Sequence, residues 1–400
     1  MRVIVIGAGA SGLAAAVAAA EHGAKVTVLE SAARPGRKLL AAGNGRCNVM
    51  NTGAPAYFGG RDFAETLFAS RPGAVQRFLE HAGILLAEEE AGRVYPACAQ
   101  SQAVLEALMN AVRRCGARVL YGHTVTEIRR TDNGFDVFLG EERFTAERVI
   151  CCCGGMAGIN LGHDGSSYRL MTEMGHALVP PRPALCGIET DQRDVSGLSG
   201  LRCPAGLTLC LGEKALDAAV GEALFARDGI SGVCAMQLAR KAGEYAGREL
   251  MLYVDFAPML FADLRQYRHF VPSPHQLSVS TERVRALLSE RRARFGEDLL
   301  VGLLPALLRE RLKNVPLGRL AEQLTAFPLR VKGTRSFDHA QVTAGGLRTD
   351  AFDPFTMESK SVPGLYACGE MLDVDGDCGG FNLQFAFLSG LAAGENAARP

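Results

Sequence analysis

The sequence of 400 residues contains no tryptophan and has no formal net charge, because 43 Lys and Arg residues balance 43 Asp and Glu residues. Proteins that bind nucleic acid through its phosphates usually have a large basic excess, so this balance argues against a nucleic-acid partner. No apolar run approaches the roughly 20 residues needed to span a bilayer, which argues against a membrane partner. The length predicts about two to three globular domains.

The 12 cysteines and eight histidines show no metal-ligand or redox pattern. No CxxC pair occurs, Cys151, Cys152 and Cys153 are consecutive, and the histidines are not paired at ligand spacing. The apolar run at the start of the chain, residues 3–6, is too short for a secretory signal. We therefore expect reduced, mostly buried thiols, a cytoplasmic location and no metal site.

Glycine is abundant, with 46 residues and no collagen-like period, which suggests tight turns and close approach of the backbone to a ligand. The first of these turns follows Val3–Ile6, an apolar run typical of a buried parallel strand. The turn, Gly7-Ala8-Gly9-Ala10-Ser11-Gly12, fits the pattern G-x-G-x-x-G. A helix over 13–22 and a second strand over 25–29, ending at Glu30, are predicted to follow. Together these parts predict a Rossmann-type dinucleotide site.

Each part of this motif has a physical task. Gly7 permits the tight turn, Gly9 lets the backbone approach a pyrophosphate, and Gly12 lets helix and strand pack closely. The helix N-terminus offers unpaired N–H groups and a positive dipole end to the phosphates. Glu30 is placed to bind both ribose hydroxyls, which favours FAD or NAD over a cofactor with a 2′-phosphate.

Two further segments favour FAD over NAD. Residues 36–48 combine the cations Arg37 and Lys38 with glycines and asparagines, which suits a loop facing phosphate and a flavin ring. Residues 364–370 predict a short strand ending in a Gly-Glu pair, and a glycine-rich loop over 376–380 then opens an apolar helix. A site assembled from both ends of the chain fits the long, bipartite FAD. The helix N-terminus near 380–382 is placed to stabilise negative charge on the flavin.

These segments resemble the bacterial FAD flavoproteins known as BaiN-type NAD(P)/FAD-dependent oxidoreductases, also called aminoacetone-oxidase-like. The matching segments are GAGASGLAAA at 7–16, GNGRCNVMN at 43–51, RDGISG at 227–232, KGTRSFDHAQVTAGG at 332–346 and TMESKSVPGLYACGEMLDVDGDCGGFNLQFAFLSG at 356–390. Two positions depart from the family: Ala41-Ala42 precedes the second segment where Thr or Ser with Gly is common, and Cys152-Cys153 replaces Ala-Thr before Gly154. Neither change removes a charge.

The predicted cofactor residues come from the fingerprint and the two glycine-rich segments: Gly7, Gly9, Ala10, Ser11, Gly12, Glu30, Arg37, Lys38, Asn44, Gly45, Arg46, Cys47, Asn48, Gly369, Glu370, Asp375, Gly380, Phe381 and Asn382. The resemblance further implies that Val125 lies against the adenine and that Gly154 lines the FAD.

Several of these side chains have a structural alternative. Arg46 and Asn48 could contact flavin or substrate or only shape their loop, and Cys47 is a buried, inert thiol on the simpler interpretation. Asp373 and Asp375 could bind the ribitol, act as acids or form a turn. His163-Asp164 could lie near the flavin, although a loop histidine is more often solvated. No residue is identified as the catalytic acid.

The fold class predicted is α/β, with a discontinuous Rossmann-like FAD domain, an inserted small β-barrel-like domain and a helical subdomain. The predicted boundaries are 1–185 with 336–400, 186–260 with 326–335, and 261–325. Helices are expected over 73–83, 100–115 and 281–295, with Ser280 as the cap of the last, and a broken helix over 299–312 around Pro305. Strands are expected over 118–121, 123–128, 135–139, 143–146, 207–211 and 250–254, with a turn at 132–134.

The resemblance implies an FAD-dependent oxidoreductase that reduces an activated, enone-type C=C bond, with a steroid-like or bile-acid-like small molecule as a candidate substrate. NAD(P)H would be a transient reductant, because only one complete dinucleotide fingerprint is encoded. Three alternatives remain: oxidation of a small amine or alcohol, FAD-dependent modification of tRNA, which the neutral charge disfavours, and a non-catalytic flavin-binding regulator. The oligomeric state is not predicted.

Overall fold

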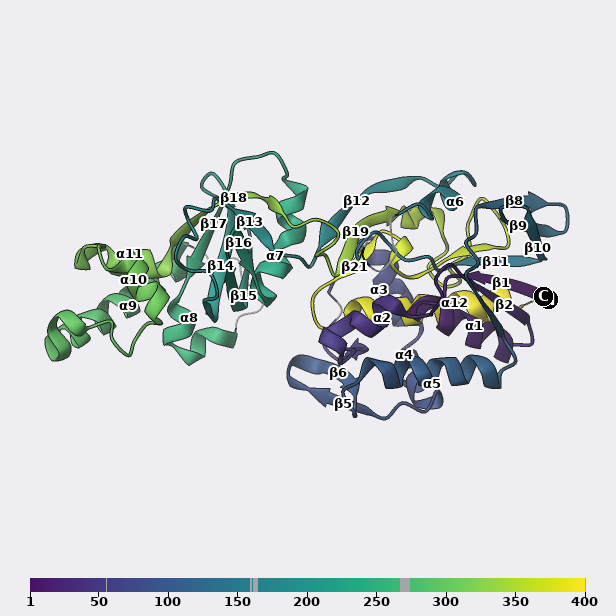
Figure 1. Cartoon of the computed structure of the whole chain (residues 1–400), viewed down its shortest axis with the longest axis horizontal. Helices are drawn as coiled ribbons and strands as arrows, with labels where there is room; N and C mark the ends of the chain where they lie inside the picture. Colours follow the sequence, from purple (N-terminus) through teal and green to yellow (C-terminus); the bar gives the residue numbers. More distant parts are fainter. Residues whose placement is uncertain (55, 159, 161–164, 267–273, 400) are drawn as a thin grey trace. The chain divides into compact units, whose positions relative to one another are not determined.

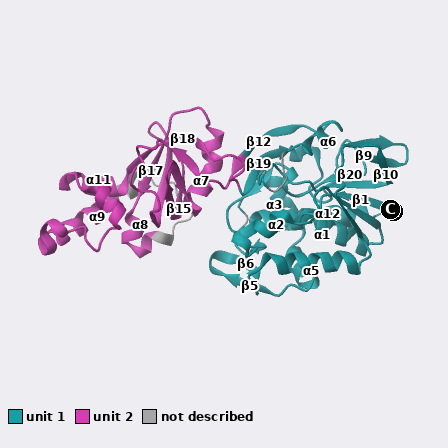
Figure 2. Cartoon of the chain, viewed as in Figure 1, with its two compact units in different colours: residues 1–182, 341–400 teal, residues 183–340 magenta. Residues whose placement is uncertain are grey.

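The computed structural model describes residues 1–54, 56–158, 160, 165–266 and 274–399. The chain divides into two compact units (Figure 2): Met1–Arg182 with Gln341–Pro400 form unit 1, and Pro183–Ala340 form unit 2. The corresponding boundaries expected from the sequence are 185 and 336. The finer separation of a helical subdomain from the β-domain stays a prediction.

Unit 1 contains a parallel β-sheet with the strand order β20-β11-β1-β2-β7, of which β1, β2 and β11 are labelled in Figure 1. Residues Val3–Ile6 of β1 are at most 5% exposed, as expected for a strand covered on both faces. The chain continues from β1 to β2 on one side and adds β11 and β20 on the other, so the strand order reverses at β1. Doubly wound sheets bind ligands at this switch point. The strands span Leu365–Ala367, Arg148–Cys151, Arg2–Ile6, Lys25–Glu30 and Arg118–Tyr121, in sheet order.

Helices α1 (Ala10–Glu21) and α12 (Phe381–Ala397) pack against each other with very little space between their backbones. A Cβ placed on Gly390 of α12 would lie 2.2 Å from the carbonyl oxygen of Ser11, and one on Gly394 would lie 2.3 Å from that of Ala15. Small residues at the contact therefore bring the C-terminal segment directly against the first helix.

Smaller sheets and helices complete unit 1. One sheet contains β10 (Glu142–Ala146), β9 (Gly134–Leu139) and β8 (Glu127–Thr131), and another contains β3 (Met50–Asn51), β6 (Arg93–Pro96) and β5 (Leu86–Glu89). Two further sheets are pairs: β21 (Val374–Gly376) with β4 (Tyr57–Gly59), and β12 (Leu178–Ala184) with β19 (Val342–Leu347). The helices are α2 Arg37–Ala41, α3 Arg61–Ser70, α4 Ala74–His81, α5 Ser101–Arg114 and α6 Tyr168–Thr172.

Unit 2 contains a closed barrel with the strand order β13-β16-β15-β14-β17-β18. Its core includes Phe225, which stacks on Phe256 at 6.1 Å between ring centroids, and Phe327, which meets Phe256 edge-on. The strands span Ile188–Thr190, Gly229–Ser231, Lys214–Ala226, Arg202–Leu211, Leu250–Asp255 and Phe327–Thr334 in barrel order, and the helices are α7 Val233–Glu244, α8 Ala257–Leu260, α9 Pro274–Phe295, α10 Ala306–Leu312 and α11 Leu317–Thr325.

The predicted Rossmann-like α/β fold with a small barrel and helices is confirmed. The turn between β8 and β9 and the break before α10 are also as predicted. Two local predictions are wrong. Helix α9 begins at Pro274, so Ser280 lies inside the helix and is not its cap. Residues 123–126 are not a strand, because the N–H of His123 instead bonds the carbonyl of Glu30 at 2.8 Å. Within the described residues, we find no helix with the length and apolarity to cross a membrane.

The close contact between α1 and α12 predicts that one methyl group added at Gly390 destabilises the protein. Gly390→Ala should lower the free energy of unfolding by about 1–3 kcal/mol, because the added Cβ would overlap the backbone of Ser11 although alanine favours a helix. Gly243→Ala in α7 is the matched control, since its Cβ would meet nothing within 4 Å, and it should raise stability by at most about 1 kcal/mol. Urea unfolding of both variants measures this, and equal stabilities would refute the close contact.

Candidate cofactor site

The glycine-rich turn between β1 and α1 has the geometry that a dinucleotide fingerprint requires. Gly7 has φ of 102°, and a Cβ on it would lie 2.5 Å from the carbonyl oxygen of Cys152. A Cβ on Gly12 would lie 1.9 Å from the carbonyl oxygen of Gly7. In contrast, a Cβ on Gly9 would meet nothing within 4 Å. Two glycines thus allow packing within the protein, and the third leaves open space on the side where α1 begins.

The carboxylate of Glu30 is held beside this turn. Its Oε2 accepts the N–H of Ala8 at 2.7 Å, and its Oε1 accepts the N–H of Ala32 at 2.8 Å. These bonds fix the carboxylate at the carboxyl end of β2, next to the turn. The predicted partners Glu30 and Gly7–Gly12 are therefore brought together.

The loop over residues 36–48 contains several left-handed backbone conformations, including φ of 54° at Asn44 and 61° at Cys47. Its cations are already engaged by protein groups. Lys38 forms an ion pair with Glu370, and Arg37 donates to the carbonyl of Asn160 at 3.3 Å. The remaining loop glycine of the predicted set, Gly45, also has a positive φ of 83°.

The side chains of Arg46 and Cys47 both have contacts within the protein. Arg46 pairs with Glu89, and its guanidinium lies 4.2 Å from the centroid of the Tyr95 ring. Cys47 is fully covered by protein atoms, and burial raises the pKa of its thiol to about 12. A thiol with this pKa is protonated at neutral pH and is a poor nucleophile.

The C-terminal glycine-rich segment lies directly against the two N-terminal loops. A Cβ on Gly369 would lie 2.6 Å from Ser11 Oγ, and one on Gly380 would lie 2.4 Å from the carbonyl oxygen of Met50 and 2.8 Å from Asn48 Oδ1. Segments separated by more than 300 residues of sequence thus lie against each other, and the sequence predicts that they form one site for a bipartite cofactor.

The other predicted residues of this segment have defined structural contacts. The side chain of Asn382 accepts the N–H of Gly376 and donates to its carbonyl, both at 2.8 Å. Phe381 is 8% exposed and accepts the hydroxyl of Tyr57 through its carbonyl, and Asp375, in β21, is 3% exposed. These side chains shape the loop that precedes α12.

Val125 and Gly154 occupy the loops that follow the sheet strands. Val125 is partly buried and packs against the core of unit 1, and Gly154 follows β11 with φ of 76°. Ala10 begins α1, beside Ser11. His163-Asp164 lies outside the described residues.

The cradle formed by these segments fits a dinucleotide. Neither α1 nor α12 has a side-chain N-cap or an acidic residue in its first turn, so both positive helix ends are available to an anion. Asn48 Oδ1 is buried without a hydrogen-bond partner in the described part of the chain. Buried polar atoms are nearly always paired, so this atom is explained if a bound group supplies the donor.

Thr343 was not among the predicted residues, although the segment 332–346 contains it. Its hydroxyl accepts the N–H groups of Met156 and Ala157 at 2.8 and 2.9 Å, and its own N–H donates to Glu370 at 2.9 Å. The segment Thr343-Ala344-Gly345-Gly346 does not by itself identify Thr343 as a functional residue, because the partners of Thr343 lie far away in the sequence.

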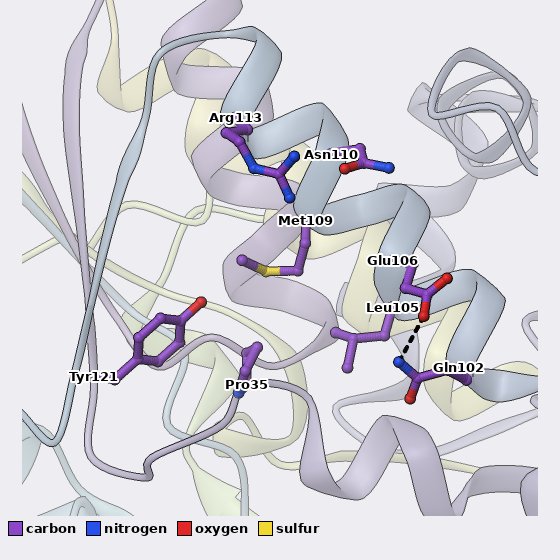
Figure 3. Close-up of a pocket in the computed structure, with 8 residues that line it drawn as sticks. All are labelled: Pro35, Gln102, Leu105, Glu106, Met109, Asn110, Arg113 and Tyr121. Atoms are coloured by element: carbon purple, nitrogen blue, oxygen red, sulfur yellow. Dashed lines mark hydrogen bonds between the residues drawn. The ribbon is translucent and has the colours of Figure 1, made fainter.

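A cavity of about 440 Å³ lies beside the loop that follows β2 (Figure 3). The side chains of Met109 and Arg113 project into it from α5, opposite Tyr121. None of the predicted cofactor residues lines this cavity, which is formed by Pro35, Gln102, Leu105, Glu106, Met109, Asn110, Arg113 and Tyr121. Among the described residues, no group of three or more His, Cys, Asp or Glu is arranged to hold a metal ion.

Comparison with known proteins gives a consistent result. The model of the HI0933-like protein Rossmann domain matches residues 1–396. A 3-dehydro-bile acid delta(4,6)-reductase from Clostridium scindens is 35% identical over 99% of both chains. A ribosomal RNA dihydrouridine synthase from Haemophilus influenzae is 28% identical over 99% of this chain and 98% of the relative.

A solved structure shares the fold. The 3-ketosteroid-delta4-(5alpha)-dehydrogenase from Rhodococcus jostii RHA1, in complex with 4-androstene-3,17-dione, superposes with a TM-score of 0.53 and 16% identity, covering 100% of this chain and 96% of that chain.

Gly9 and Gly12 of the fingerprint should respond differently to substitution by alanine. Gly9→Ala should leave the apoprotein as stable as the wild type, because its Cβ has room, but should weaken FAD binding at least about tenfold by filling the space that a pyrophosphate needs. Gly12→Ala should instead lower the melting temperature of the apoprotein, because its Cβ overlaps Gly7. Thermal unfolding and titration with FAD, followed by flavin fluorescence, separate the two effects. Unchanged FAD affinity in Gly9→Ala would contradict the assignment.

Proposed function

The chain belongs to the HI0933-like protein family and is an FAD-dependent oxidoreductase, and from this premise we propose that it reduces a C=C bond conjugated to a carbonyl in a steroid-like small molecule. The observation that carries the proposal is the 35% identity to the bile-acid reductase over 99% of both chains. The contacts of Gly369 with Ser11, of Gly380 with Asn48 and of Glu30 with Ala8 support the proposal, because these residues belong to the predicted FAD site.

We propose that the residues of this cradle hold the cofactor as the sequence predicts. The open side of Gly9 and the N-terminus of α1 would receive the pyrophosphate, and Glu30 would receive a ribose. FAD, when bound, supplies the two-electron chemistry of hydride transfer. The uncapped N-terminus of α12 would favour negative charge at its end of the site.

Reduction of an enone adds a hydride to the β-carbon and a proton to the α-carbon. The polarised carbonyl makes the β-carbon electrophilic, so a group that donates a hydrogen bond to the carbonyl oxygen would increase the rate. We propose NAD(P)H as the source of electrons, docking transiently, because the sequence encodes one complete dinucleotide fingerprint.

A second candidate substrate is uracil in ribosomal RNA. The observation that favours it is the 28% identity to the dihydrouridine synthase over nearly the whole of both chains. The C5=C6 bond of uracil is conjugated to the C4 carbonyl, so this reaction and the reduction of a steroid enone belong to the same class. We place RNA second, because the chain has no basic excess to bind phosphates.

Anaerobic reoxidation of the reduced flavin tests the proposal. The FAD-loaded protein is reduced with dithionite, freed of excess reductant and mixed with 4-androstene-3,17-dione. We expect the visible flavin absorbance to return and the steroid to gain two hydrogens, because the conjugated C=C bond accepts the hydride and a proton. The saturated analogue, which has the same ring system without the C=C bond, should leave the flavin reduced.

The alternatives give different results in the same assay. Reoxidation by ribosomal RNA but not by the steroid would identify the RNA base as substrate, and reduction of the oxidised flavin by a small amine would support an oxidase. Mixing the oxidised protein with NADH and NADPH tests the reductant, and bleaching by neither would remove NAD(P)H from the proposal.

A further inference from the structure

Three segments around the cofactor site are joined by Thr343 and Glu370. Thr343 lies in β19 and is 0% exposed, so its side chain cannot touch a ligand. Its hydroxyl accepts the N–H groups of Met156 and Ala157. These two residues belong to the loop that leaves β11, the strand beside the fingerprint turn.

Glu370 connects this loop to the loop of residues 36–48. One carboxylate oxygen accepts the N–H of Thr343 at 2.9 Å, and the other pairs with Lys38. A Cβ on Gly155 would lie 2.4 Å from Thr343 Oγ1 and 2.8 Å from Glu370 Oε1. The loop after β11 is therefore packed directly onto both Thr343 and Glu370.

We infer that Thr343 is a positioning residue of the FAD site, which holds the loop after β11 in place through its hydroxyl. The inference rests on FAD binding and does not depend on the proposed substrate. The segment 332–346 resembles the family but has no role assigned from the sequence, and a positioning role of Thr343 would give it one.

The energetic reason is that one oxygen pairs two backbone donors, the partly buried N–H of Met156 and the buried N–H of Ala157. Without the hydroxyl, the N–H groups of Met156 and Ala157 lose their acceptor, and a buried unpaired donor is costly. The loop would then move to find other acceptors, and Gly154-Gly155 would move with it. The turn that carries Glu370 has a separate support, because the N–H of Gly369 donates to Ser389 Oγ at 2.9 Å. The loop after β11 is thus the part of the site that depends on the hydroxyl of Thr343.

The test compares Thr343→Val, Thr343→Ser and Thr325→Val in the full chain. Thr343→Val keeps the shape and removes the hydroxyl, so it should raise the dissociation constant of FAD roughly tenfold and alter the visible circular dichroism of the bound flavin. Thr343→Ser keeps the hydroxyl and should restore both to within about twofold of the wild type.

Thr325→Val is the matched control. Thr325 is 1% exposed, lies in unit 2, and its hydroxyl bonds the carbonyl of Ala321 at 3.0 Å and Thr281 Oγ1 at 2.7 Å. This variant should lower the melting temperature of the apoprotein and leave the FAD dissociation constant and the flavin spectrum unchanged. If Thr343→Val behaves in the same way, its role is only structural and the inference is wrong. Failure of Thr343→Ser to restore FAD binding would also overturn it.

Discussion

The close contact between α1 and α12 is the interaction on which the cofactor site depends. Gly390 and Gly394 allow the backbone of the last helix to meet the carbonyls of Ser11 and Ala15. Because α12 is held at this distance, its N-terminus lies beside the loop of residues 36–48, and Gly369 lies against Ser11. Two parts of a bipartite cofactor site at opposite ends of the chain thus become one through the absence of a few side chains.

Hydrogen bonds to carboxylates and hydroxyls then set the detailed shape of the site. Glu30 fixes the fingerprint turn through Ala8, and Glu370 joins Lys38 to β19. Thr343 extends this arrangement to the loop after β11. Glu30 and Thr343 satisfy backbone donors in loops, where a regular strand or helix does not provide acceptors, and Glu370 satisfies a backbone donor of β19. These hydrogen bonds therefore fix the arrangement of the segments, and a fixed geometry is what positions a cofactor's reactive atoms.

The relatives of the chain are related by chemistry as well as by sequence. The names of the bile-acid reductase and of the dihydrouridine synthase both describe saturation of a C=C bond next to a carbonyl. The two names thus describe one class of reaction on two different substrates. A shared fold can support different substrates, because function depends on the residues of the individual site.

The sequence by itself determined the local parts of this protein. The run Val3–Ile6, the turn Gly7–Gly12 and the carboxylate of Glu30 are neighbours in sequence, so spacing alone predicts the βαβ unit, and the glycine-rich segments predict FAD. The start of the strand predicted over 123–128 and the start of α9 were predicted wrongly, since tertiary contacts decide where such elements begin and end. Only the tertiary structure placed Arg46 on Tyr95 and made Thr343 a link between loops. The reason is that these properties depend on partners tens to hundreds of residues away, and local spacing contains no information about them.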